Sequence, residues 1–152
     1  MAVEDFLAEN LKTGVRQFPI DDYGKLRLIH FEIIPGVAGD AGSTAQLLRL
    51  PHGRIRLIPN LSRFWHDAFG ASRVLNIGHA AYQKEGGVDE ALSANAFVAA
   101  NDVSLAGTAK VLGTTRKYDM FSRKGIVVTA QCTGGTWPSG CKLNGYLAVV
   151  TE

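Results

Sequence analysis

Short apolar runs separated by turn-forming residues recur along this chain and constrain its fold more than any other feature. From about residue 25 onward, runs rich in Leu, Ile, Val and Phe are closed by Gly, Pro, Asn or Asp at intervals of about 8 to 12 residues. This spacing is typical of an all-β sandwich or barrel. We therefore expect residues 25–152 to form a single antiparallel β-sandwich domain, which suits a chain of 152 residues.

Residues 88–99, VDEALSANAFVA, have the pattern of a helix. Asp89 is a suitable cap, and Leu92, Ala96 and Phe97 would lie on one side of the helix. We expect at most one short helix, in this segment.

Residues 25–36, KLRLIHFEIIPG, form a β-type run whose apolar phase changes. Leu26 and Leu28 are even-numbered, whereas Ile29, Phe31 and Ile33 are odd-numbered. This change predicts either a bulge or a strand buried on both sides. In a later run, Arg54 and Arg56 alternate with Ile55 and Leu57, so both guanidinium groups are expected on one face, toward solvent or an interface.

The two cysteines, Cys132 and Cys141, flank the loop TGGTWPSG near the end of the chain. If they lie opposite each other in a hairpin, one face carries six apolar residues, namely Ile126, Val128, Ala130, Leu143, Leu147 and Val149. We expect this to be a core face. The sulfurs would lie within disulfide range, but in a reducing cytoplasm we expect two buried thiols, with a disulfide or a metal as alternatives.

Residues 1–24 lack a regular pattern, and we interpret them as an N-terminal arm or a short helix that leads into the domain. Arms that leave a compact body often contact another chain, so Phe6 and Leu7 are candidate interface residues. No apolar run approaches the roughly 18 residues that a membrane span needs. The start of the chain also lacks the features of a signal peptide, so we expect a protein that is made and used without crossing a membrane.

Charge indicates no partner, because 16 basic and 14 acidic residues are interspersed and give a net charge of +2. Five arginines could form a basic stripe, namely Arg49, Arg54, Arg56, Arg63 and Arg73. The aromatic interleaving typical of RNA-binding domains is missing beside them. We therefore expect neither nucleic acid nor a membrane as a partner.

The stretch NLSRFWHDAFGASRVLNIGHAAY, residues 60–82, gathers residue types that often catalyse reactions. His66 and Asp67 are neighbours and would point to opposite faces of a strand. Ser62 and His66 would lie about 13 Å apart on one extended strand. The chain has no GxSxG elbow and no phosphate-loop pattern, and its histidines (His30, His52, His66 and His79) have no metal-ligand spacing. We expect no enzyme, no catalytic residues, no cofactor and no metal.

Two tryptophans are candidate contact residues. Trp65 alternates with Arg63 and Asp67, which favours a polar face where an aromatic marks an interface; the alternative is that Trp65 fills the core. Trp137 lies in a loop between Gly135 and Pro138, and we expect it to be exposed and to contact a partner. The candidate interface set is Phe6, Leu7, Arg63, Trp65, Asp67 and Trp137.

A pattern of strand and turn residues covers about half of the chain. Its residues are Pro59, Leu61, Ser62, Ala68, Phe69, Gly70, Arg73, Leu75, Ile77, Gly78, Ala81 and Tyr82, followed by Asp102, Val103, Ser104, Ala106 and Gly107. This pattern resembles that of small structural proteins of tailed bacteriophages, and the group is similar to capsid cement, or decoration, proteins that stabilise the head.

The resemblance implies a β-sandwich of jelly-roll type that binds the outside of the head as a dimer or trimer. Its partners would be the major capsid protein and further copies of itself. It would be located on the capsid surface of the virion, after assembly in the host cytoplasm.

Two alternatives stay open at this point. One is another virion component, such as a head-to-tail or tail part. The other is a β-sandwich or barrel that binds a small ligand or sugar, or an enzyme whose site is built from separate strands. A deep pocket lined by His30, His66 or His79 would favour the latter, whereas a flat apolar patch would favour assembly.

Overall fold

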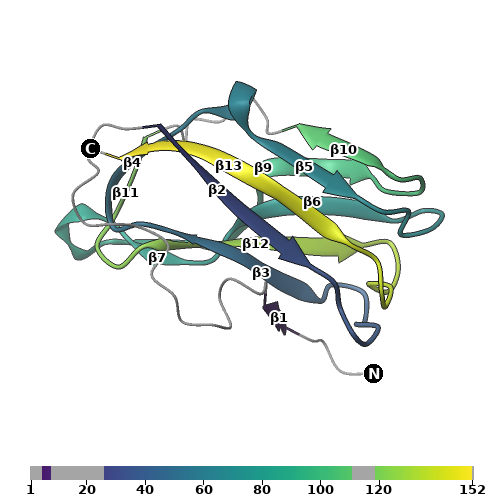
Figure 1. Cartoon of the computed structure of the whole chain (residues 1–152). Coiled ribbons are helices and arrows are strands. Elements are labelled where there is room, and N and C mark those ends of the chain that lie inside the picture. The colour runs from purple at the N-terminus through teal and green to yellow at the C-terminus, as the bar shows by residue number, and fades with distance from the viewer. Residues whose placement is uncertain (1–4, 8–25, 111–118, 152) are drawn as a thin grey trace.

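The computed structural model describes residues 5–7, 26–110 and 119–151. In this part of the chain two β-sheets lie face to face around one apolar core (Figure 1). Helical geometry in it is limited to two three-residue 3-10 turns, η1 (Pro59–Leu61) and η2 (Glu85–Gly87). The predicted all-β antiparallel fold is confirmed, while the jelly-roll type stays a prediction. Most of the predicted arm, residues 1–24, lies outside the described residues.

One sheet, here called sheet I, has the strand order β1-β3-β12-β6-β9. Its strands are β1 (Asp5–Leu7), β3 (Thr44–Leu50), β12 (Ile126–Thr133), β6 (Val74–His79) and β9 (Ser93–Asp102). The pairings are antiparallel except that β1 runs parallel to β3. The register between β3 and β12 shifts at Val128 and Thr129. At this bulge both Leu47 and Leu48 are buried, although they are consecutive in the chain.

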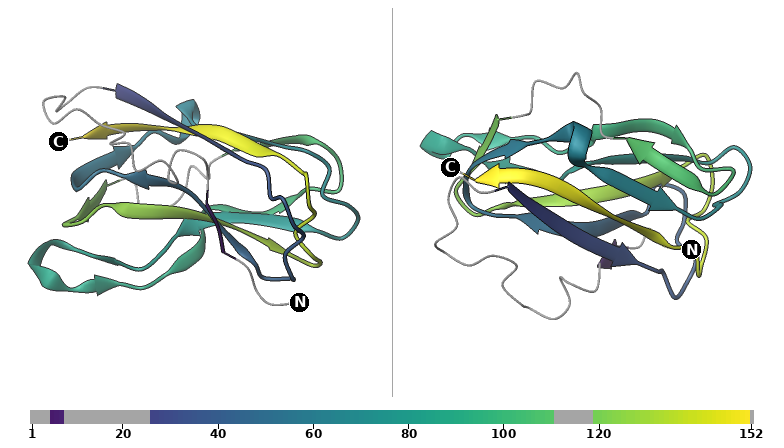
Figure 2. Two further views of the ribbon diagram at one scale, coloured as in Figure 1. Left: turned by 60° about the horizontal axis from the view of Figure 1, so that its bottom comes forward. Right: turned by 45° about the horizontal axis from the view of Figure 1, so that its top comes forward.

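The other sheet, sheet II, is built around the long strand β13. Its strands are β2 (Leu26–Ile33), β4 (Gly53–Leu57), β5 (Arg63–His66), β10 (Gly107–Lys110), β11 (Asp119–Ser122) and β13 (Leu143–Thr151). β2 pairs along one side of β13, while β5 and β4 pair in turn along the other side. β10 extends the sheet beyond β5, and β11 extends it beyond β4. Figure 2 shows the two layers from further directions.

The predicted core face at the end of the chain is confirmed, but the predicted hairpin is wrong. All six residues of that face are fully buried, namely Ile126, Val128, Ala130, Leu143, Leu147 and Val149. However, β12 pairs with β3 and β6, whereas β13 pairs with strands of sheet II. The connection between β12 and β13 therefore carries the chain from one sheet to the other. Strands on opposite sides of one core alternate in the same way as strands of a hairpin, so the pattern alone could not separate the two arrangements.

The helix predicted for residues 88–99 is also wrong. Asp89 belongs to the two-residue strand β8 (Asp89–Glu90), which pairs with β7 (Tyr82–Gln83), and Ala96 and Phe97 lie in β9. β9 pairs with β6 through a register with two irregularities. A short Ala-rich helix is marginal by itself, and hydrogen bonds to β6 together with burial of Phe97 outweigh it. No helix in the described ranges has the length and apolar character of a membrane span.

Candidate partner interface

An aromatic row crosses the outer face of sheet II. Tyr146 of β13 lies opposite His30 of β2 on one side and opposite Arg63 of β5 on the other. The ring centroid of Tyr146 lies 5.3 Å from that of His30 and 5.6 Å from that of Trp65. Three neighbouring strands therefore contribute one ring each to a continuous row.

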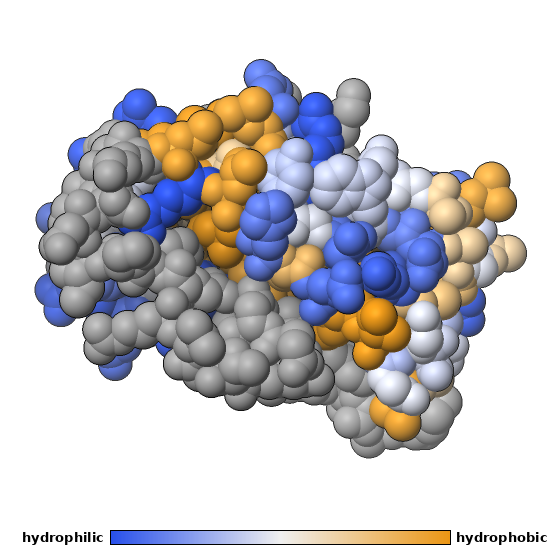
Figure 3. Space-filling model, viewed as in Figure 1, coloured by the Kyte–Doolittle hydropathy of each residue, from blue (hydrophilic) through white to orange (hydrophobic). Residues whose placement is uncertain are grey.

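Two leucines extend this row into an apolar patch. Leu26 and Leu28 of β2 are 52% and 49% exposed, and Trp65 is 40% exposed. We call the set Leu26, Leu28, His30, Trp65 and Tyr146 the Trp65 face. Figure 3 shows hydrophobic residues gathered over the left-hand parts of β2 and β13, with more polar surface beside them. A patch of this kind, with polar residues around it, is typical of a contact surface.

The phase change in residues 25–36 produces the apolar part of this face. The prediction of a bulge or of a strand buried on both sides is wrong, because β2 pairs with β13 in a regular register. Ile29, Phe31 and Ile33 are buried, whereas Leu26 and Leu28 point outward. β2 thus has an apolar inner face and, in its first half, an apolar outer face. The two leucines are the sequence signal of this exposed apolar surface, although the sequence alone favours irregular pairing or burial on both sides as their explanation.

Arginines border the Trp65 face. Arg56 of β4 lies opposite Val150 of β13, and Arg54 and Arg56 are exposed while Ile55 and Leu57 are buried. The prediction that both guanidinium groups share one face is therefore confirmed. In β5, Arg63 donates a hydrogen bond from Nη1 to the carbonyl oxygen of Ser62 at 2.8 Å. These cations give one border of the face a basic character.

The opposite corner of this sheet carries charges of both signs. The ammonium group of Lys142 lies 3.2 Å from the carboxylate of Glu32. Asp67 is exposed at the end of β5, and its Oδ2 accepts a hydrogen bond from the backbone N–H of Lys142 at 2.8 Å. The N–H of Asp67 donates in turn to the carbonyl of Lys142 at 3.0 Å. Asp67 thus ties β5 to the start of β13, and its contact with a partner stays a prediction.

Trp137 does not fit the predicted interface, because the expectation that it is exposed is wrong. Its exposed fraction is 0%, and its ring centroid lies 5.5 Å from that of Phe69. Its backbone forms an isolated bridge with Gly39, with N–O distances of 3.0 and 2.9 Å. The loop that holds Trp137 crosses between the sheets at one end of the sandwich, so its large apolar side chain closes the core there.

The residues that suggested a hydrolase are separate structural contacts. Ser62 is fully buried, and its Oγ bonds to backbone groups of Ile58 and Ala148. In His66, Nδ1 lies 3.0 Å from the carbonyl oxygen of Asp67, and Nε2 lies 3.2 Å from Nδ2 of Asn101. Each side chain thus links backbone groups or neighbouring strands, and the hydrogen bonds of the Ser62 hydroxyl to Ile58 and Ala148 are both with backbone groups.

The histidines do not converge on one pocket. His30 lies on the outer face of sheet II, while His66 packs edge-on against Phe69. His79 is fully buried and packs against Tyr82 and Phe97. Within residues 5–7, 26–110 and 119–151, no group of three His, Cys, Asp or Glu side chains is placed to hold a metal ion.

The two cysteines are free thiols in different surroundings. Cys132 is fully buried in the core, whereas Cys141 is partly exposed and lies with Sγ 3.4 Å from the carbonyl oxygen of Ala68. Burial raises the pKa of both thiols, and the nearby Asp67 carboxylate raises the pKa of Cys141 further. Both groups are therefore weaker nucleophiles near neutral pH than an ordinary cysteine.

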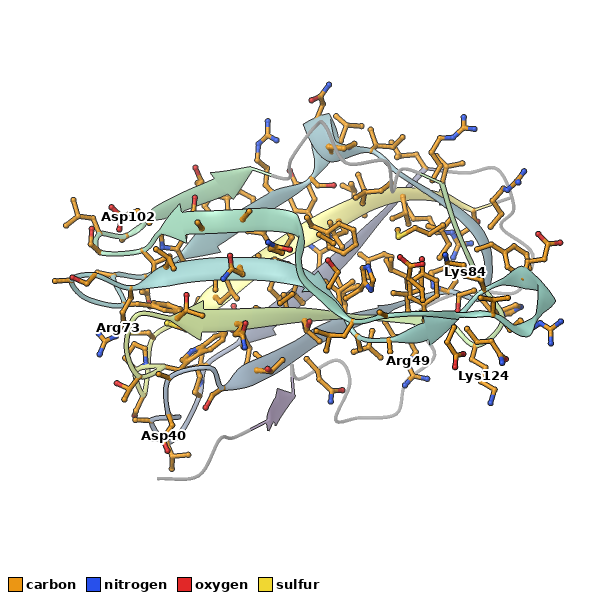
Figure 4. The ribbon with its side chains drawn as sticks, turned by 180° about the vertical axis from the view of Figure 1, so that it is seen from behind. Asp40, Arg49, Arg73, Lys84, Asp102 and Lys124 are labelled. Carbon is orange, nitrogen blue, oxygen red and sulfur yellow. The ribbon has the colours of Figure 1, made fainter. Side chains whose placement is uncertain are left out.

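The two ends of the sandwich carry different charged groups. Figure 4 shows Asp40, Arg73 and Asp102 at one end and Arg49, Lys84 and Lys124 at the other. At the first end, Arg73 donates hydrogen bonds to the carbonyl of Phe69 and, at 3.1 Å, to Oγ1 of Thr136. This arginine therefore joins two loops.

The same end has its own exposed apolar residues. Leu105, in the loop after Asp102, is 76% exposed, and Ile34 and Val37 of the loop after β2 are 50% and 63% exposed. The backbone N–H of Ser104 donates to the carboxylate of Asp102 at 2.8 Å, which lowers the pKa of Asp102. These loops lie off the Trp65 face and offer a control site for tests of it.

Comparisons with known proteins place the fold among phage capsid chains. A chain in the solved capsid of Ralstonia phage GP4 is similar over 98% of this chain and 99% of that chain, with a TM-score of 0.73 and 17% identity. A chain in the capsid asymmetric unit of cyanophage Pam1 is similar over 91% of this chain and 93% of that chain, with a TM-score of 0.58 and 11% identity. No family model and no curated protein sequence matches this chain. At these identities the likeness defines a shared fold.

Proposed function

We propose that this protein is a non-enzymatic structural protein of a tailed-bacteriophage virion that binds the capsid exterior and stabilises the head. The observation that carries this proposal is the likeness to chains of two phage capsids over nearly the whole length of both partners. A match that spans the complete fold supports a common role for the whole domain better than a match to one motif. The jelly-roll type of the sandwich belongs to this proposal.

The Trp65 face is the surface that we assign to the capsid shell. Its exposed leucines and aromatic rings would be dehydrated by contact with an apolar area of the shell, which favours binding by about 25 cal/mol for each Å² of apolar surface buried. Arg56 and Arg63 border it and would lie opposite acidic side chains of the shell. The expected partner surface is therefore apolar at its centre and acidic on one side.

Cementing requires only modest affinity from each copy. Many copies on a closed shell act together, and each copy that bridges two capsid subunits resists their separation. The partners in this role are the major capsid protein and further copies of this chain. The protein would join the capsid surface in the host cytoplasm during assembly and need no cofactor there.

Add-back to heads that lack this chain tests the proposal. Purified wild-type protein should co-sediment with such heads at many copies per particle and should raise the temperature at which they lose DNA. The double variant Leu28→Ala/Trp65→Ala should bind at least tenfold more weakly. Leu105→Ala, in the loop after Asp102 and off the Trp65 face, should bind like wild type. The face lies outside the core, so circular dichroism should show both variants folded.

Three outcomes would overturn parts of this assignment. Equal heat resistance with and without saturating protein would exclude a cement role. Saturation at a few copies per head would indicate a head-to-tail component instead. Equal binding by wild type and Leu28→Ala/Trp65→Ala, with loss of binding in Leu105→Ala, would assign the contact to the end of the sandwich that carries Leu105.

A further inference from the structure

The outer edge of β3 holds a short strand from a distant part of the chain. β3 pairs with β12 on one side and with β1 on the other. The β1 pairing comprises three residue pairs, Asp5 with Thr44, Phe6 with Ala45, and Leu7 with Gln46. An open strand edge presents unpaired backbone N–H and C=O groups, and β1 covers that edge at the start of β3. Figure 1 shows β1 at the outer margin of the sheet, beside this part of β3.

We propose that β1 is exchanged between copies, so that Asp5–Leu7 of one copy pair with Thr44–Gln46 of a second copy and link the copies into a closed oligomer. Every copy carries the same β1 and the same β3, so the β1 of a second copy matches the edge of β3. Every hydrogen bond of the pairing within one chain is formed again between two chains, so exchange loses none of them. The candidate interface residues Phe6 and Leu7 then contact another copy of this chain.

The length of chain between β1 and β2 permits the exchange. Eighteen residues, 8–25, separate Leu7 from Leu26. Fully extended, they span roughly 60 Å, at about 3.3 Å for each residue. The distance to be covered within one copy is about the length of β2, since β1 lies near the end where β2 passes to β3; eight residues of strand measure about 26 Å. The surplus is enough for β1 to reach the sheet of a neighbour.

The parallel pairing does not by itself hold β1 on the sheet of its own chain. Antiparallel neighbours can be joined by a tight hairpin, whereas a parallel pair such as β1 and β3 has no such turn to hold it. β2, to which β1 is connected, lies in the other sheet. The three residue pairs between β1 and β3 can therefore form equally well within one chain or between two chains. Closure of a ring, in which each copy donates one β1 and receives another, adds the multivalency that a single three-residue strand lacks.

Cysteine cross-linking distinguishes exchange from pairing within one chain. Leu7→Cys and Gln46→Cys would occupy directly opposed positions, and neighbouring strands bring Cα atoms within the 4.4–6.8 Å range that a disulfide spans. Both substitutions would be made in a Cys141→Ser chain, in which Cys132 stays because it is buried. A Leu7→Cys chain would be mixed with a Gln46→Cys chain of different mass, denatured together, refolded and oxidised mildly. Ser139→Cys, an exposed position in another loop, replaces Gln46→Cys in the control mixture.

The proposal predicts a covalent heterodimer in the Leu7→Cys and Gln46→Cys mixture and much less in the control mixture. The double variant Leu7→Cys/Gln46→Cys should give linked chains that end at one closed species, a dimer or a trimer. Deletion of residues 1–7 should shift the mass in light scattering to that of a monomer, with the β-type circular dichroism unchanged. A double variant that forms only a link within one chain, or that forms no link at all, would overturn the exchange.

This inference goes beyond the capsid role, and the two can fail separately. A chain that is monomeric but still binds and stabilises heads would remove only the exchange. A chain that exchanges β1 but leaves heads unbound would remove only the cement role.

Discussion

The side-chain hydroxyl of Ser62 takes the place of a backbone group in the hydrogen-bond ladder of β13. Its Oγ accepts a bond from the N–H of Ala148 at 3.0 Å and donates to the carbonyl of Ile58 at 2.9 Å. β13 pairs with β5 up to Tyr146 and with β4 from Val149, so Ala148 lies in the gap between them. The N–H of Ile58 donates to the carbonyl of Ala148 at 2.8 Å. Both backbone groups of Ala148 are therefore satisfied across the gap.

Ser62→Ala should lower the free energy of unfolding by about 1 to 3 kcal/mol, because it leaves the buried N–H of Ala148 without an acceptor. Urea denaturation followed by circular dichroism measures this change. Ser139→Ala is the control, since Ser139 is exposed and its Oγ lies 3.4 Å from the carbonyl oxygen of Gly36. Equal stability of the two variants would contradict the role of Ser62.

Gly78→Ala should be severely destabilising, because β6 and β9 approach closely at this glycine. An added Cβ would lie 1.8 Å from the carbonyl oxygen of Ser93 and 2.6 Å from the carbonyl carbon of Ala94. Both contacts are with backbone, so β9 would have to move, at a cost of about 1 to 3 kcal/mol or more. Hydrogen exchange should show faster opening of β9.

Gly36→Ala is the matched control for Gly78→Ala, because no atom lies within 4 Å of a Cβ added there. It should unfold at the wild-type urea concentration. If Gly78→Ala did the same with unchanged exchange in β9, the close approach of the two strands would be wrong.

The sequence predicts the fold class and the buried faces well, because alternation reports which side of a strand is apolar. The inner residues of β4, β12 and β13 are identifiable in this way, whereas the two apolar phases of β2 leave its inner face ambiguous. Alternation does not report which strands are neighbours. Cys132 and Cys141 illustrate the limit, since two strands in opposite sheets gave the same pattern as a hairpin.

The predictions for the helix and for Trp137 are wrong for a different physical reason, which is that long-range contacts outweigh local preference. Residues 93–98 have Ala-rich composition, but pairing with β6 fixes them as a strand. Trp137 sits among Gly and Pro, as an exposed loop residue would, yet it fills the space beside Phe69. For the candidate interface, Trp65 and Arg63 were found from alternation. Tyr146 was missed, because its place beside Trp65 depends on a pairing between distant strands.

The two tryptophans should differ strongly in stability and fluorescence. Trp137→Ala should cost about 3 to 5 kcal/mol, because it empties a fully buried site, whereas Trp65→Ala should change the stability by about 0.5 kcal/mol or less. In the Trp65→Phe variant the remaining emission should be blue-shifted and resistant to acrylamide. In the Trp137→Phe variant it should be quenched readily. Similar quenching of both variants would contradict the burial of Trp137.

The thiols should report their surroundings through the pH dependence of their reactions. One thiol, Cys141, should react slowly with Ellman's reagent in the native protein, and Cys132 should react only after denaturation. Because burial and Asp67 raise the pKa of Cys141, its rate should still be rising above the ordinary thiol pKa of 9.0. Cys141→Ser should abolish the native reaction, and Cys132→Ala should leave it unchanged.

A raised pKa in the folded state also affects stability. The unfolded chain loses the thiol protons near the ordinary pKa of 9.0, whereas the folded chain keeps them to higher pH. The contribution of these thiols to the free energy of unfolding is therefore fully present below the ordinary pKa of 9.0. It is lost as the pH rises through the folded-state pKa. Urea midpoints measured from pH 7 to pH 10.5 should fall less steeply in Cys132→Ala/Cys141→Ser than in wild type, once their different starting stabilities are subtracted. Parallel curves would show that the thiols have the same pKa in both states.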